Sequence, residues 1–175
     1  MASSSQSLRF LFCFFLPLCF GSPKITVIMD KMAWLENLVL DPFSDSLFTS
    51  ELTTGRVWKV YADSQGSYTQ SLWISNFTRI LGLTKDPSIP GMIYGVGEIN
   101  NTNVVFNASS LVPQQYNIIA TTPPDRIGNG FACHFTTGLL YTSSEGDFNP
   151  GTGSVYEINP STGQVTTITG TTYTF

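Results

Sequence analysis

The segment GRVWKV (Gly55–Val60) recurs 98 residues later as GSVYEI (Gly153–Ile158). Both copies run glycine, polar residue, valine, aromatic residue, charged residue, aliphatic residue. Valine and aromatic side chains favour strands, and the leading glycine is typical of a turn. NVVF (Asn103–Phe106) lies between the two copies and fits the same place in a middle unit. The three segments predict three copies of one β unit.

The repeat extends to both sides of these segments. Similar segments open at Leu38, Leu83 and Phe131, 45 and 48 residues apart, and each leads through a polar turn to an aliphatic–aromatic pair. A last strand then closes each unit: SLWI (71–74), YNIIA (116–120) and QVTTI (164–168). A period of roughly 40 to 50 residues with four short strands is typical of a propeller blade. We therefore predict an all-β fold, a partial β-propeller with four-stranded blades at about 33–75, 79–121 and 127–170.

A β-sandwich is the alternative, because its strands also alternate and turn often. Three blades do not close a ring, since the smallest usual rings have about four. We expect the chain to be the N-terminal half of a larger propeller or the product of a truncated gene model, with unpaired blade edges able to self-associate. Trp34, Trp58 and Trp73 are expected to pack between blades.

The N-terminal residues resemble an export signal. Leu8–Phe20 is an apolar run of 13 residues that contains Arg9 near its start and is followed by the small residues Gly21 and Ser22. This order predicts a secretory signal peptide at 1–21 and a propeller segment at 22–175. An uncleaved anchor is the alternative, although a span needs roughly 20 residues. We expect a secreted, extracellular protein without stable membrane insertion after cleavage.

Cysteines and glycosylation motifs agree with export. Cleavage would leave Cys133 as the single cysteine, and so no internal disulfide. Such a thiol is free and buried, joined to another molecule, or missing its partner segment. Three N-x-[ST] sequons, at Asn76, Asn100 and Asn107, predict a glycoprotein. The formal net charge of −4 becomes −5 without the leader, because that segment holds one arginine and no acid. This balance indicates no nucleic-acid partner.

Two polar residues are candidate metal ligands. Glu36 lies in WLENLVLDP (34–42) among large apolar side chains, where an unpaired buried carboxylate would cost several kcal/mol. It is a ligand, or it is exposed at a blade edge or paired with Lys31 or Arg56. Asn129 in RIGNGFACHF is a ligand or the first residue of an Asn-Gly turn.

The segments WLENLVLDPFSDSLFTSELTTGRVWKV and NGFACHFTTGLLYTSSEGDFNPGTGSVYEINPSTGQV resemble the SMP-30/gluconolactonase/LRE-like family. The resemblance implies a six-bladed propeller with a divalent metal ion in its channel and metal-dependent hydrolysis of lactones or related esters. It places Glu36 on a ligand at the start of the first innermost strand and Asn129 on an Asn-Gly ligand. The family's catalytic aspartate would lie in later blades, so the catalytic residue is unknown in this chain.

A carboxylate with amide oxygens suits Ca²⁺, Mg²⁺ or Mn²⁺, and Zn²⁺ also accepts it. We therefore predict a secreted metal-dependent lactonase-like hydrolase, incomplete in this chain, acting on a lactone or ester. The alternative is a non-catalytic extracellular propeller that binds a partner, because function lies in sites carried by the fold. His134 has the place that Asp41 and Asp86 have in the other units, so we expect a turn residue and not a base.

Overall fold

The computed structural model describes residues 34–124, 127–144, 146 and 152–169, so the predicted signal peptide lies outside the described residues. These ranges contain no helix, so they contain none that is long and apolar enough to cross a membrane. They form twelve strands: β1 (Leu35–Asp41), β2 (Ser46–Glu51), β3 (Arg56–Ala62), β4 (Tyr68–Ile74), β5 (Arg79–Lys85), β6 (Met92–Ile99), β7 (Thr102–Ser109), β8 (Asn117–Thr121), β9 (Ile127–Cys133), β10 (Leu140–Ser144), β11 (Ser154–Ile158) and β12 (Val165–Thr169).

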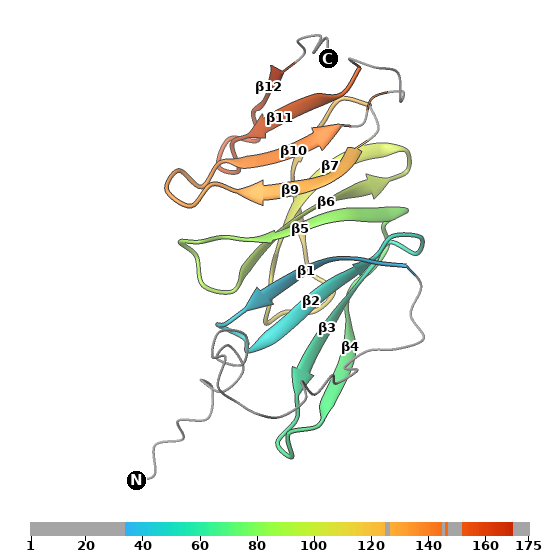
Figure 1. Ribbon diagram of the computed structural model, residues 1–175, viewed down its shortest axis with the longest axis vertical. Helices are drawn as coiled ribbons and strands as arrows, with labels where there is room; N and C mark the ends of the chain where they lie inside the picture. Colours follow the sequence, from blue (N-terminus) through green and yellow to red (C-terminus); the bar gives the residue numbers. More distant parts are fainter. Residues whose placement is uncertain (1–33, 125–126, 145, 147–151, 170–175) are drawn as a thin grey trace, which may run out of the picture.

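The strands form three antiparallel sheets, each built from four consecutive strands in chain order. We call the sheets blade 1 (β1–β4), blade 2 (β5–β8) and blade 3 (β9–β12). Figure 1 shows the blades following one another along the long axis of the molecule. The predicted fold class, all-β with three four-stranded blades, is confirmed. The first strands lie side by side, because β5 contacts both β1 and β9. They therefore form the innermost edge, which lines the axis of a propeller.

Apolar side chains fill the space between successive blades. Sheets packed face to face bury alternate residues of each strand, which explains why aliphatic and aromatic residues recur at every second position. The buried cluster between blades 1 and 2 contains Val39, Phe48, Val57, Trp73, Ile74, Phe77, Ile80, Leu83, Ile93, Val104, Phe106 and Ala108. The cluster between blades 2 and 3 contains Leu81, Tyr94, Val96, Val105, Ala120, Leu140, Tyr156 and Ile158.

Gly82 allows a close approach of blade 2 to blade 3. A Cβ atom on this residue would lie 2.4 Å from Cβ of Phe131 in β9 and 2.9 Å from Cγ1 of Val96. Real side chains do not come so close, so only glycine allows the two innermost strands their present separation.

The three tryptophans have different environments, and Trp58 is the one that is partly buried. Trp73 is 1% exposed and its ring lies 4.5 Å from that of Phe48. Its indole Nε1 also donates a hydrogen bond of 3.1 Å to the carbonyl oxygen of Ser109 in blade 2. Trp73 thus packs between blades as expected. Trp34 does not, because 74% of its surface is exposed.

Candidate functional site

Glu36 lies near the start of β1, on the innermost edge of blade 1, and is partly buried. Its carbonyl oxygen accepts hydrogen bonds from the hydroxyls of Ser50 at 2.9 Å and Thr49 at 3.3 Å. Lys31 lies outside the described residues. Among the described residues, Glu36 forms no ion pair with Arg56. The ion pair that these residues do form joins Arg79 and Glu98, with a 2.7 Å contact. Arg56, the one of the two candidates that the structure describes, therefore does not pair with the carboxylate.

A β-bulge follows Glu36 and holds it against blade 2. The pairing of β1 with β2 skips Asn37, which has a left-handed backbone (φ 53°). Asparagine adopts this conformation more readily than most residues. Its side-chain Nδ2 donates a hydrogen bond of 2.6 Å to the carbonyl oxygen of Leu81 in β5. Bulges often re-aim a neighbouring side chain, and this one fixes where the strand carries Glu36.

Three turn residues fix how the blades correspond. Asp41 accepts hydrogen bonds from the backbone N–H groups of the second and third residues after it, Phe43 and Ser44. Asp86 does the same toward Ser88 and Ile89.

His134 is the third member of this set. Its Nδ1 accepts from the N–H groups of Thr136 at 3.3 Å and Thr137 at 3.2 Å. The proton of the neutral ring is therefore on Nε2. The prediction that His134 is a turn residue is confirmed.

Counted back from the turn residues, Glu36, Leu81 and Asn129 have the same place in the sequence of their blades, because the same 45 and 48 residues separate both sets. Strand pairing differs between the blades, since Glu36 pairs with Ser50 whereas the pairing of β5 with β6 skips Leu81. Leu81 is 4% exposed and belongs to the apolar cluster between blades 2 and 3, so blade 2 provides no polar group there. Asn129 is part of β9, and its side chain lies outside what the structure describes. Glu36 and Asn129 thus lie the same number of residues before the turn residues of their innermost strands.

The described residues provide few side-chain donors for a metal ion. No group of three or more His, Cys, Asp or Glu side chains gathers anywhere in the described residues. A site built on Glu36 would hence have one carboxylate, with amide, carbonyl or water oxygens as the other ligands. Such a set is chemically suitable for a hard cation, but Ca²⁺ needs about 6 to 8 oxygens. By chemical type, the carboxylate of Glu36 and the amide of Asn129 are two of the oxygen donors that such a site uses.

The turn carboxylates are structural and charged. Burial alone would raise the pKa of Asp86, but hydrogen bonds from Ser88, Tyr94 and Ile89 outweigh it and lower the pKa below 3.8. Tyr94 provides its hydroxyl hydrogen to Asp86 Oδ2 over 2.8 Å, and burial together with this bond raises the pKa of Tyr94 well above 10. The partly buried thiol of Cys133 also has a raised pKa, through burial and the charge of Asp86. These groups are poor acids, bases or nucleophiles at neutral pH.

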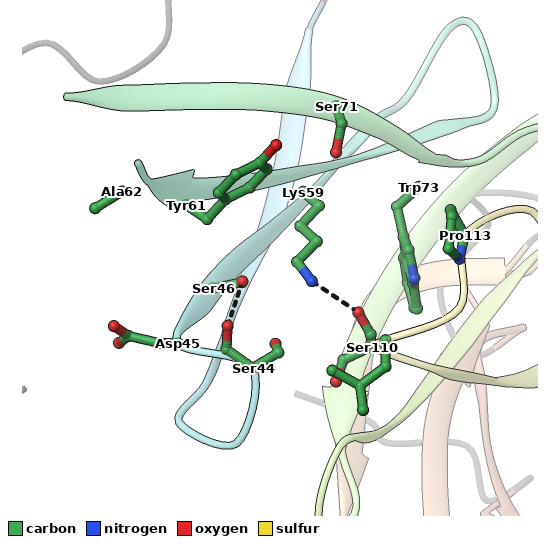
Figure 2. A pocket seen from close by; sticks show the side chains of 11 residues that line it. Ser44, Asp45, Ser46, Lys59, Tyr61, Ala62, Ser71, Trp73, Ser110 and Pro113 are labelled. Carbon is green, nitrogen blue, oxygen red and sulfur yellow. Dashed lines mark hydrogen bonds between the residues drawn. The ribbon is translucent and has the colours of Figure 1, made fainter. Parts of the chain in front are cut away.

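A groove of about 290 Å³ opens between blades 1 and 2 (Figure 2). Lys59 of β3 extends into it, and its Nζ donates a 2.9 Å hydrogen bond to the carbonyl oxygen of Ser110. The ammonium lies 5.7 Å from the ring centre of Phe48 and 6.0 Å from that of Tyr61. Among the described residues no carboxylate forms an ion pair with Lys59. An ammonium has three donor hydrogens, so two remain for a ligand. The groove could not be predicted from the sequence, because a single lysine in GRVWKV does not indicate a binding site.

The sequon asparagines differ in accessibility. Asn76 and Asn100 are exposed and lie in turns with left-handed backbones (φ 73° and 50°). Asn107 lies inside β7, and its Oδ1 accepts a 3.2 Å hydrogen bond from Asn117 Nδ2. The first two are the better placed to receive a glycan.

The architecture is that of a β-propeller segment. A chain in the crystal structure of a nidogen/laminin complex is similar to it, with a TM-score of 0.63 and 18% sequence identity. The match covers 82% of this chain and 51% of that chain, so this protein spans about half the length of its structural neighbour. No family model matches the sequence, and no curated protein is a significant match. At this identity the likeness shows the fold alone.

Proposed function

We propose that this chain is a secreted extracellular propeller segment whose innermost strands contribute to a divalent metal site for hydrolysis of a lactone or related ester. The observation that carries the proposal is that Glu36 on β1 and Asn129 on β9 lie equally far before their turn residues, with the Asn37 bulge holding the first strand in place. The resemblance to the SMP-30/gluconolactonase/LRE-like family supports the same two residues and a six-bladed ring.

Within this proposal Glu36 and Asn129 hold the cation, which would be Ca²⁺, Mg²⁺, Mn²⁺ or Zn²⁺. A divalent ion at such a place polarises a carbonyl oxygen of the substrate. The chain's own contribution would be positional, because the hydrogen bond accepted by the Glu36 carbonyl and the one donated by the Asn37 side chain hold β1 on the innermost edge. The remaining ligands and the base would come from other blades of the ring.

Metal binding tests the site independently of turnover. The secreted chain is titrated with Ca²⁺ and with Mn²⁺ by calorimetry, and glucono-δ-lactone hydrolysis is followed in parallel. Glu36→Gln is expected to weaken metal binding at least tenfold, because an amide replaces the carboxylate. Asp45→Asn is the matched control: it also removes one negative charge, at an exposed turn residue with φ 47° that asparagine tolerates. Equal metal affinity in Glu36→Gln and the wild type would remove Glu36 from the site, and hydrolysis that persists after chelation of the metal would count against a metal-dependent hydrolase.

The Lys59 groove supports a second candidate, a non-catalytic binding module. A cation beside Tyr61 and the serines of the groove wall matches an acidic sugar, which presents a carboxylate, hydroxyls and an apolar ring face. Binding of oligogalacturonate to the immobilised protein would be lost in Lys59→Met and retained in Lys85→Met, which removes an exposed lysine elsewhere. Equal binding by both variants, or none by the wild type, would reject this function.

A further inference from the structure

Each blade has two faces, and the residues of the central strands alternate between them. We call the face toward the preceding blade the leading face and the face toward the following blade the trailing face. Cross-strand pairing assigns corresponding positions on the leading faces, because Leu47 pairs with Val60 as Ile93 pairs with Ala108 and Leu140 with Ile158. The four corresponding leading-face positions are Leu83, Ile93, Phe106 and Ala108 in blade 2, Phe131, Leu140, Tyr156 and Ile158 in blade 3, and Leu38, Leu47, Trp58 and Val60 in blade 1.

The leading faces of blades 2 and 3 are buried against the blade before them. All four positions of blade 2 belong to the cluster shared with blade 1, and those of blade 3 belong to, or pack on, the cluster shared with blade 2. Blade 1 has the same apolar pattern on its leading face. Leu38 is nevertheless 68% exposed, whereas its counterpart Leu83 is 5% exposed. Leu40, on the same face, is 52% exposed. Val60 in β3 is 2% exposed, so the open part of this face, among the described residues, lies along β1 at Leu38 and Leu40.

Blade 3 has the complementary surface at the other end. The trailing-face pair Phe48 and Val57 of blade 1 is fully buried, and its counterparts in blade 2, Tyr94 and Val105, are 4% and 0% exposed. Tyr141 and Val155 hold these positions in blade 3 and are only partly buried. Glu157, also on this face, accepts a 2.7 Å hydrogen bond from the Tyr141 hydroxyl. In the part of this face that the structure describes, the Glu157 carboxylate thus has a hydrogen-bond partner within the face itself.

We propose that a second copy of this chain closes the ring, with the trailing face of each blade 3 packed on the leading face of the other copy's blade 1. A two-fold axis along the channel makes this contact twice and leaves neither end face open. Three blades from each copy make six, within the usual range of propeller sizes. The proposal is independent of metal binding.

The test is the molar mass of the secreted chain, measured by light scattering after deglycosylation. We expect twice the monomer mass. Leu38→Glu and Ala132→Glu each place a charge on one end face, where the present side chain is exposed and the fold of the single copy does not need it. Both are expected to give monomers. Leu111→Glu is the control, because Leu111 is 57% exposed in the β7–β8 connection, outside both faces, and this variant should remain dimeric.

The two end-face variants separate ring closure from other modes of association. An equimolar mixture of Leu38→Glu and Ala132→Glu should regain dimers, because one of the two contacts is then wild type on both sides. A monomeric wild type would overturn the proposal and leave further blades of a longer chain as the occupant. A dimer broken by Leu38→Glu but not by Ala132→Glu would also overturn it, since leading faces would then pair with each other. Open chains of higher mass would exclude closure.

Discussion

Asn37 in β1 donates a side-chain hydrogen bond of 2.6 Å, from Nδ2, to the carbonyl oxygen of Leu81 in β5, and so links the innermost strands of blades 1 and 2. The bond lies at the innermost edge, directly beside Glu36, and depends on the left-handed backbone of Asn37. Local conformation and contact between blades are therefore coupled at one residue.

Substitutions at Asn37 should separate these two contributions. Asn37→Gly keeps the left-handed backbone and loses the hydrogen bond, at a cost of about 1 kcal/mol. Asn37→Ala also strains the backbone, and the total loss should reach about 2 kcal/mol or more. Denaturant unfolding measures both free energies. If alanine were no worse than glycine, the bulge would not require its left-handed conformation.

Tyr94→Phe tests the buried bond to Asp86. The carboxylate loses one donor, and we expect a loss of about 1.5 to 3 kcal/mol at neutral pH, the usual range for a bond to a charged group. Unfolding in denaturant gives this value, and circular dichroism at neutral pH checks that the variant still folds.

The pH dependence of this variant follows from the lowered pKa of Asp86. A carboxylate with a depressed folded-state pKa contributes stability that is complete above 3.8, its unfolded value, and is lost as the pH falls through the lower folded value. The wild type should therefore lose more stability than Tyr94→Phe below pH 3.8, and the difference between the two should narrow in acid. A constant difference across this range would show that the carboxylate does not depend on Tyr94.

His134 can be replaced by aspartate, the residue found at the corresponding turn positions, Asp41 and Asp86. His134→Asp provides a carboxylate acceptor for the N–H groups of Thr136 and Thr137, so stability should be equal to the wild type or slightly higher. His134→Ala leaves both N–H groups to solvent and should cost roughly 0.5 to 1.5 kcal/mol. Thermal unfolding ranks the three proteins. An alanine variant as stable as the aspartate variant would remove this turn from the fold's determinants.

Gly82→Ala should disturb the contact between blades 2 and 3. The added methyl group would overlap Cβ of Phe131, so β5 and β9 must separate, at a cost of about 1 to 3 kcal/mol. Gly130→Ala is the control, because its methyl group would meet the Ser143 hydroxyl at 3.1 Å, and a hydroxyl can rotate away. Equal unfolding midpoints for the two variants would contradict the close approach.

The fold could be predicted because the sequence repeats in register. The aliphatic–aromatic pairs and the turn residues keep their 45- and 48-residue spacing, and these residues determine strand pairing and burial. The role of His134 followed from the same spacing. The spacing also contained the correspondence of Glu36, Leu81 and Asn129, which becomes evident once the turn residues are aligned.

Other features of the site depend on conformation and on distant segments. The Asn37 bridge requires a left-handed backbone that asparagine permits but does not dictate. The Lys59 groove forms because the connection after β7 brings Ser110 to β3, 51 residues away along the chain. The exposure of Leu38 could not be derived from the pattern either, since its apolar character is the same as that of buried Leu83.

Each blade consists of four successive strands, so none of the three described sheets contains a strand from a distant part of the chain. Ribosomes add roughly 5 to 20 residues per second, and a unit of this kind leaves the exit tunnel within seconds. We expect the strands of each sheet to pair before the next sheet is synthesised. The apolar face of each new sheet then packs on the sheet before it. Short connections between sheets also mean that gain or loss of one unit during evolution would leave the pairing within every other unit intact.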